Sequence, residues 1–263
     1  MANITGTTGN DELFGTSDSD TISALAGNDK ITGGLGADTL YGNEGDDEFL
    51  LGSPDIVAGE VIDGGTGTNA ISIFGAANLA IFSFTNIQTL NIHHPSVTLS
   101  AAQFSSLSRI WAVSSAPSTL FAADTGTYNF SNRTVAGATF TFVGSAGDDT
   151  IIGNDAKQNI IGGLGADVLT GNNGSDVFIY RSRVESTVTQ TDVITDFFKG
   201  VDKIDLTGLN FLGVTSGIPV QGWLNLTYES AANVTTLTDL GGSGFVIRLN
   251  GNHLALDNTD FIG

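Results

Sequence analysis

Aspartate residues recur every nine residues in two parts of this 263-residue chain. Five nonapeptides follow one another from Gly6, and four more follow from Gly144, all without an insertion. Their sixth position holds Asp11, Asp20, Asp29, Asp38 and Asp47 in the first block, and Asp149, Gln158, Asp167 and Asp176 in the second. Carboxylates at so regular a spacing are candidate ligands for a series of hard cations.

Each nonapeptide contains the elements that would position its aspartate. The first six residues are rich in glycine, asparagine and aspartate, which favour sharp turns because glycine accepts a positive φ. The last three residues carry one large apolar side chain at their centre and predict a minimal β-strand. Two nonapeptides would form one coil of a solenoid, and successive coils would stack about 4.8 Å apart.

Stacking of the coils predicts rows of carboxylates along the edges of the first block. Asp11, Asp29 and Asp47 would form one row, and Asp20 and Asp38 another. Two charged carboxylates at this separation repel by about 1 kcal/mol in water and several times more at a lower effective dielectric constant. A cation between them removes that repulsion. Carboxylate and carbonyl oxygens in flexible turns suit calcium, which takes about six to eight oxygen ligands, better than magnesium.

These repeats resemble the repeats-in-toxin (RTX) family, whose fold is a calcium-filled parallel β-roll. In that family, one ion binds the carbonyls of positions two and four and the aspartate of one repeat. It also binds the carbonyls of positions one and three and the aspartate of the repeat two further on. The resemblance therefore implies several calcium ions, and it leaves the pairing of Gln158 with Asp176 open because an amide brings no charge. The alternative is a set of glycine-rich turns with structural aspartates and no metal.

The ligand sets that this resemblance implies are Thr7, Gly9 and Asp11 with Ala24, Ala26 and Asp29; Thr16, Asp18 and Asp20 with Gly33, Leu35 and Asp38; Leu25, Gly27 and Asp29 with Gly42, Glu44 and Asp47; and Ser145, Gly147 and Asp149 with Gly162, Leu164 and Asp167.

The composition narrows the classes of partner. Twenty-eight acidic residues face nine basic ones, and a net charge of −19 argues against binding to nucleic acid. The absence of cysteine excludes disulfides, thiolate metal sites and cysteine nucleophiles. No run of eighteen apolar residues predicts a membrane span, and the segment after Met1 does not look like a conventional signal peptide.

Residues 51–143 lose the strict period but retain short apolar runs. These runs are Ile71–Phe74, Leu79–Phe84, Ile87–Ile92, Val97–Leu99, Ile110–Val113 and Thr139–Val143. They predict further solenoid coils with longer turns, with a short helical turn at Ser100–Leu107. A separate β-sandwich is the competing interpretation. We expect Phe82, Phe84, Trp111, Phe121 and Phe130 to belong to the core rather than to a sugar-stacking face.

The segment from Asp192 to Leu206, DVITDFFKGVDKIDL, is similar to the serralysin-type C-terminal domain, as is the ending from Gly244 to Gly263. This resemblance implies a β-rich cap on the roll and a signal for type I export. We therefore predict an all-β chain, a right-handed parallel β-roll or β-helix solenoid with calcium-binding nonapeptide turns. Its expected segments are an N-terminal RTX roll (1–52), middle coils (53–143), a second RTX roll (144–180) and a cap with the secretion region (181–263).

Catalytic motifs are not recognisable in the sequence. There is no H-E-x-x-H or G-x-S-x-G motif, and neighbouring His93 and His94 would point to opposite faces of a strand or lie in an exposed turn beside Pro95. Asp55, Glu60 and Asp63 are the candidates for a glycoside-hydrolysing carboxylate pair.

We predict a non-catalytic, calcium-binding protein of the cell surface or extracellular space that folds on binding calcium outside the cell. Two alternatives remain open. One is a surface-layer, adhesin or filament subunit that self-associates through the ends of the solenoid. The other is an enzyme that acts on a polysaccharide in a groove on the middle coils.

Overall fold

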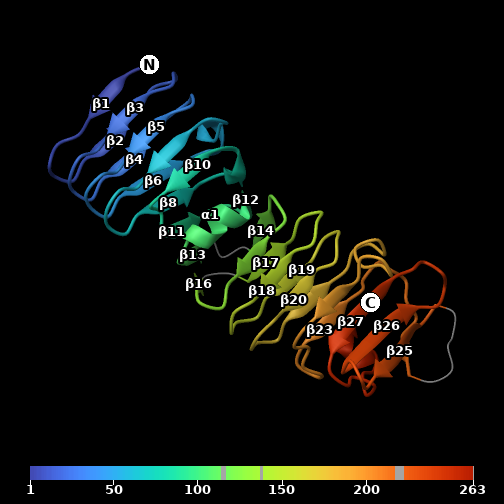
Figure 1. Cartoon of the computed structure of the whole chain (residues 1–263). Coiled ribbons are helices and arrows are strands. Elements are labelled where there is room, and N and C mark those ends of the chain that lie inside the picture. Colours follow the sequence, from blue (N-terminus) through green and yellow to red (C-terminus); the bar gives the residue numbers. More distant parts are fainter. Residues whose placement is uncertain (114–116, 137–138, 217–221, 263) are drawn as a thin grey trace. The chain divides into compact units, whose positions relative to one another are not determined.

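The computed structural model describes residues 1–113, 117–136, 139–216 and 222–262. The chain is almost entirely β-structure and divides into two compact units (Figure 1). The first unit contains Met1–Ala123 and Arg133–Ala138, and the second contains Asp124–Asn132 and Thr139–Gly263. Among the described helices, none is long and apolar enough to cross a membrane. The finer division into four segments stays a prediction.

In the first unit, nearly all strands are short and pair in parallel with the strand one coil away. One sheet contains β1 (Asn3–Thr5), β3 (Thr21–Ser23), β5 (Thr39–Tyr41), β7 (Val61–Asp63) and β10 (Ser83–Thr85). A second contains β2 (Glu12–Phe14), β4 (Lys30–Thr32), β6 (Glu48–Leu51), β8 (Ala70–Ile73), β11 (Thr89–Ile92), β13 (Arg109–Ala112) and β16 (Thr134–Ala136). Strands β9 (Ala77–Asn78), β12 (Ser96–Leu99) and β14 (Ser118–Ala122) form a further ladder. This is the predicted parallel solenoid.

The centre of each three-residue strand supplies the core. Ile22, Ile31 and Leu40 are fully buried, whereas the residues on either side of them are partly or largely exposed. Glycine at position one of a repeat has a steric reason, because a Cβ on Gly15 would lie 1.9 Å from the carbonyl oxygen of Gly33 in the next coil. The coils therefore stack only where this position stays small.

The middle coils are parallel solenoid turns, so the β-sandwich alternative is wrong. Their turns include the 3-10 helices η1 (Ser53–Asp55) and η2 (Leu79–Ile81) and the helix α1 (Ala101–Ser106). The helical turn expected at Ser100–Leu107 is confirmed: the Ser100 hydroxyl accepts the N–H of Gln103 at 3.2 Å, and the Gln103 side chain accepts the N–H of Ser100 at 3.1 Å. The strand expected at Leu79–Phe84 is wrong at its start, since Asn78 accepts the N–H of Ala80 and begins η2 instead.

Two of the predicted core aromatics lie on the outside. Phe82, Phe84 and Phe130 are buried as expected, but Trp111 is 43% exposed and Phe121 is 38% exposed. Their strands, β13 and β14, place Ile110 and Leu120 inward, and alternation then turns the next residue outward. Both are core predictions that the one-residue alternation overturns.

The second unit is a roll followed by a small antiparallel sheet. One ladder contains β17 (Phe140–Val143), β19 (Asn159–Ile161), β21 (Val177–Ile179), β23 (Lys203–Asp205) and β28 (Phe261–Ile262). The other contains β15 (Thr127–Asn129), β18 (Thr150–Ile152), β20 (Val168–Thr170), β22 (Asp192–Ile194), β27 (Val246–Asn250), β26 (Val234–Asp239), β25 (Leu224–Glu229) and β24 (Val214–Thr215). The 3-10 helix η3 (Asn258–Asp260) precedes β28.

Two late strands cover the edges of the second roll. Strand β27 pairs in parallel with β22 on one side and antiparallel with β26 on the other, while β28 pairs in parallel with β23. Arg183 stabilises the antiparallel sheet. Its guanidinium lies 2.8 Å from the carboxylate of Asp239, the last residue of β26, and stacks over the ring of Phe211. The β-rich C-terminal cap expected from the sequence is present.

Leu25 offers a test of the turn geometry. It occupies position two of its repeat with φ 78°, a left-handed conformation that costs a leucine about 1 kcal/mol or more. We expect Leu25→Gly to raise the unfolding free energy of the calcium-loaded protein by about 1 kcal/mol in urea titrations. Leu35→Gly is the matched control, since Leu35 is similarly exposed but has a negative φ, and it should lower stability slightly. Destabilisation by Leu25→Gly would contradict this account.

Candidate calcium sites

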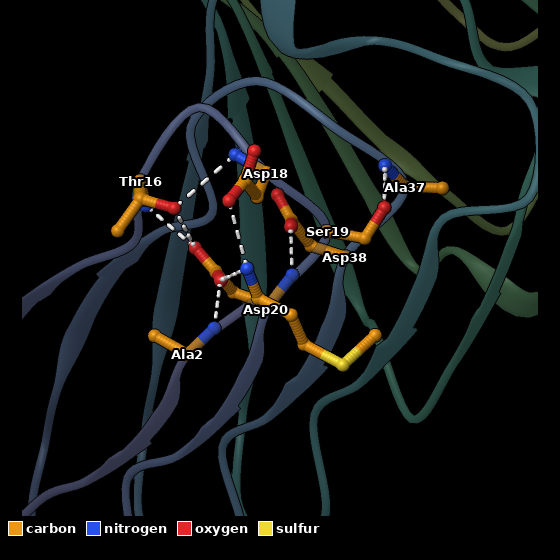
Figure 2. Close-up of polar contacts among 8 residues, drawn as sticks. Ala2, Thr16, Asp18, Ser19, Asp20, Ala37 and Asp38 are labelled. Atoms are coloured by element: carbon orange, nitrogen blue, oxygen red, sulfur yellow. Dashed lines mark hydrogen bonds and ion pairs between the residues drawn. The ribbon is translucent and has the colours of Figure 1, made fainter.

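The repeat aspartates stack in the predicted rows, which hydrogen bonds between coils hold in register. In the first row (Asp11, Asp29, Asp47), each backbone N–H donates to the Oδ1 of the aspartate one coil further on, at 2.7 Å from Asp11 and 2.9 Å from Asp29. The second row (Asp20, Asp38) has the same bond at 2.7 Å. Figure 2 shows Asp38 accepting from Asp20 in this way, and Asp20 accepting from Ala2.

A second set of hydrogen bonds between coils involves position five. Here each side chain accepts an N–H from the coil that follows it, whereas the aspartate at position six accepts from the coil that precedes it. Asn10 accepts the N–H of Asn28 at 2.9 Å, and Asn28 accepts that of Asp46 at 2.9 Å. In the neighbouring turn, the Ser19 hydroxyl accepts the N–H of Ala37 at 3.1 Å (Figure 2). Side chains at positions five and six thus link each turn to the neighbouring coils, and these bonds between coils use one oxygen of each aspartate that accepts them.

That second carboxylate oxygen is buried and has no hydrogen-bond partner in six aspartates of the described chain. These are Asp29, Asp38, Asp47, Asp167, Asp176 and Asp192, each at most 1% exposed. A buried polar atom without a partner costs about 1–3 kcal/mol, and more if it carries charge. Six such oxygens in regular rows are a chemically coherent set of ligands for a hard cation.

The first aspartate of a row is partnered differently. The Oδ2 of Asp20 accepts both the N–H and the hydroxyl of Thr16, at 2.6 and 2.7 Å (Figure 2). Thr7 partners Asp11 and Ser145 partners Asp149 in the same way. In later repeats, position two holds a residue with positive φ, and its N–H does not reach the carboxylate; these residues are Leu25, Gly34, Asn43, Gly163 and Asn172. Position two therefore determines whether the carboxylate oxygen is occupied or left for a ligand.

The rows of the second unit extend beyond the nonapeptides. The third row (Asp149, Asp167) continues to Asp192, whose Oδ1 accepts the N–H of Asp167 at 2.9 Å. The fourth row (Gln158, Asp176) continues to Asp202 in the same way at 3.0 Å. Sequence reasoning missed both residues as row members because their spacing from the preceding aspartate is 25 and 26 residues instead of 18. A usable signal was the acid two residues before an inward isoleucine, Ile194 or Ile204.

In two places an amide stands where a carboxylate would be. The first row continues to Asn69, which accepts the N–H of Asp47 at 2.9 Å and donates to the carbonyl of Asn86 at 3.1 Å. In the fourth row, Gln158 accepts the N–H of Asn154 at 3.1 Å and donates to the Asn154 side chain. Both amides are satisfied by protein groups alone, so these positions require no cation.

The predicted ligand sets lie in these turns, but side chains alone do not complete a site. Within the described ranges, no group of three or more His, Asp or Glu side chains converges. An ion would therefore need backbone carbonyls beside two carboxylates, as the predicted sets require. The carbonyls of Thr16, Leu25, Glu44 and Ser145 already accept one N–H from another coil, and a carbonyl oxygen retains a second lone pair. The four ligand sets remain predictions.

Comparison with known proteins identifies the first repeat block and the C-terminal half of the chain. The family model for the RTX calcium-binding nonapeptide repeat matches residues 3–30 and 14–49. The model described as peptidase M10 serralysin C terminal matches residues 122–262, more than half of the chain. The chain belongs to the serralysin C-terminal family. Both resemblances drawn from the sequence are thereby confirmed, and this serralysin-type chain is a calcium-binding β-roll protein.

Two curated relatives are epimerases from Azotobacter vinelandii. The chain is 42% identical over 77 residues to the mannuronan C5-epimerases AlgE3 and AlgE2. The match covers 27% of this chain but only 4% and 8% of those two proteins. Among solved structures, the AlgE6R2 subunit of the same organism's epimerase has a TM-score of 0.35 at 26% identity, covering 56% of this chain and 91% of that one. The AlgE6R3 subunit has a TM-score of 0.26 at 20% identity, covering 98% and 80%.

Burial raises the pKa values of several aspartates in the rows of both units. It raises the pKa of Asp167 and Asp176 to about 7 and that of Asp192 to about 8, since a buried carboxyl without a cation favours its neutral form. Burial likewise raises the pKa values of Asp38 and Asp47, and neighbouring aspartates add to the effect. Asp20 differs, because its hydrogen bonds from Thr16 lower its pKa.

Other residues singled out in the sequence do not assemble a site. His93 and His94 lie in the turn after β11, not in a strand: His93 stacks on Phe74 at 4.4 Å, and His94 accepts the N–H of Ser96 at 3.3 Å. Of the carboxylates considered for glycoside hydrolysis, Glu60 is only 1% exposed. Asp63 accepts hydrogen bonds from Gly65 and Asn86. These two are not presented to a substrate as an accessible pair.

The raised pKa values predict that calcium-free protein loses stability as pH rises. A carboxyl whose pKa is higher in the folded state binds more protons there, so its contribution is present near pH 4 and is lost as pH rises through the folded-state pKa of about 7 to 8. Far-UV circular dichroism in EDTA should therefore show a smaller folded fraction at about pH 8 than at about pH 5. Saturating calcium should abolish this trend. Equal or greater stability of the calcium-free protein at pH 8 would contradict the prediction.

Proposed function

We propose that this chain is an exported, non-catalytic module whose β-roll folds when calcium binds the aspartate rows outside the cell. The observation that carries the proposal is the set of buried carboxylate oxygens without a partner in successive coils. In an unfolded chain these carboxylates are hydrated and far apart, so the sites do not exist before folding. Ion affinity then becomes folding free energy.

The concentration of calcium supplies the switch. Extracellular calcium modules have dissociation constants of about 10⁻⁴–10⁻³ M, so they stay empty where calcium is scarce and fill where it is millimolar. A site exposed to calcium at about ten times its dissociation constant stabilises the folded state by about 1.4 kcal/mol. Several such sites together are comparable with the whole stability of a typical domain, about 5–15 kcal/mol.

Membership of the serralysin C-terminal family supports an extracellular destination. RTX repeats and this C-terminal domain are typical of secreted proteins, and we propose the type I secretion machinery as the partner that exports the chain. A roll that lacks calcium inside the cell would stay loose enough to be threaded through an exporter. Folding would follow when the chain meets calcium, and the cap formed by β25–β28 would close the last coil.

A structural or surface-associated role fits the roll better than catalysis. In this proposal the buried carboxylates of the rows are calcium ligands for folding, and the amides that end the first row stand where no ion is required. Glu60, which had been considered for chemistry on a sugar, lies inside the coil rather than on its face. Asp63, another of the three acids named from the sequence, accepts hydrogen bonds from Gly65 in its own turn and from the Asn86 side chain in the next coil.

Asp167→Asn tests the proposed ligands against a matched control. In far-UV circular dichroism titrations at neutral pH, this variant should need about tenfold more calcium to fold, equivalent to about 1.4 kcal/mol. In EDTA it should be at least as folded as the wild type, because an amide avoids the buried charge. Asp155→Asn removes an exposed charge from the same roll and should leave the midpoint nearly unchanged. A wild-type chain that is fully ordered in excess EDTA, or identical midpoints for the two variants, would contradict the proposal.

A further inference from the structure

Glu60 is a buried acid that the nonapeptide pattern does not explain. Its side chain is 1% exposed, and neither of its carboxylate oxygens accepts a hydrogen bond of normal geometry within the described chain. The backbone N–H of Val57 lies near enough to favour the anion, but it does not offset the burial of the charge. It lies immediately before β7, in a turn that η1 lengthens beyond nine residues. A fully buried carboxylate with two unpartnered oxygens requires either a proton or a cation.

The strand register makes Glu60 the third member of the second row. Thr21 pairs with Thr39 and Thr39 pairs with Val61, so the residues directly before them lie in successive coils. The backbone bonds agree: Thr39 N–H donates to the carbonyl of Asp20 at 2.9 Å, and Val61 N–H donates to that of Asp38 at 2.8 Å. Glu60 therefore follows Asp38 as Asp38 follows Asp20.

The first and second rows end in different ways. The first row passes from Asp47 to Asn69 and then to Gln88, each amide accepting the N–H of the residue before it. Asn69 also donates to the carbonyl of Asn86, so the end of this row is satisfied without an ion. The second row instead ends on a carboxylate, and no described lysine or arginine forms an ion pair with Glu60 or Asp38. The second row therefore retains its unbalanced charge at its last member.

Oxygen atoms are available around Glu60. Asp38 keeps its buried, unpartnered Oδ2. At position two of the preceding coil, the carbonyl of Thr16 accepts an N–H from Leu35. Within the described residues, no N–H donates to the equivalent carbonyl of Gly34 in the coil below Glu60. Two oxygens in the coil before Glu60, Asp38 Oδ2 and the carbonyl oxygen of Gly34, are therefore without a hydrogen-bond donor.

We propose that Glu60 and Asp38 together bind one calcium ion, which extends the second row by one site beyond the last nonapeptide. The carbonyl of Gly34 is the backbone ligand that the structure favours. Burial, together with the charges of Asp38 and Asp55, raises the pKa of Glu60 to about 8. This inference rests on the proposed function, since it adds a ligand of a different type to the same kind of site.

Counting the bound ions tests the proposal directly. Native mass spectrometry of the full-length protein in calcium should show one ion fewer for Glu60→Gln than for the wild type. The control variant Glu12→Gln removes an exposed glutamate of the same unit and should bind the wild-type number. If Glu60 is instead a neutral acid, Glu60→Gln will bind as many ions as the wild type, which overturns the proposal.

Asp38→Asn gives a second measurement that does not depend on the Glu60 variant folding. Asp38 supplies the second carboxylate of the Asp38–Glu60 ion, so Asp38→Asn should bind at least one ion fewer than the wild type; an unchanged ion count would overturn the proposal. The proposed function and the Glu60 site can be refuted separately. A wild type that binds no calcium would refute the aspartate rows, whereas equal ion counts in a calcium-loaded wild type and Glu60→Gln would refute the Glu60 site alone.

Discussion

The structure depends on the close stacking of carboxylates in a parallel roll. Coils linked by backbone hydrogen bonds bring an acid of one turn against the acid of the next, and the Oδ1 of each is used to hold the register. The Oδ2 atoms are then buried without a protein donor. Elsewhere in proteins, an arginine or a helix N-terminus balances such an anion. In these turns, a divalent ion is the group that can serve two stacked acids at once.

The local features of the roll follow from this constraint. Position one is glycine at Gly6, Gly15 and Gly144 because the carbonyl of the next coil occupies the space of a Cβ. Within the nonapeptides, position two has a positive φ wherever the aspartate is left unpartnered, and it is threonine or serine where an aspartate begins a row. Asn69 and Gln158 neutralise a row member by replacing it with an amide. Each departure from the aspartate pattern therefore changes whether that turn needs the positive charge of a cation.

Much of this could be predicted from the sequence, because an 18-residue coil repeats the same steric and electrostatic problem. The strands of both rolls, the rows themselves, the helical turn after Ser100 and the C-terminal cap all follow from local rules. Residues beyond the strict period were harder to place. Asp192, Asp202 and Glu60 join their rows through longer turns, so the 18-residue spacing does not place them. Trp111 and Phe121 were misplaced because one residue of alternation decides which face of a strand is inside.

A crystal structure grown with calcium and phased to show anomalous scattering from the ions tests the central claim most directly. The account predicts anomalous peaks within about 2.3–2.6 Å of the Oδ2 atoms of stacked aspartates such as Asp29 and Asp47, with backbone carbonyls completing the coordination. Ordered coils with those carboxylates bonded only to protein or water, and no peak between them, would contradict it.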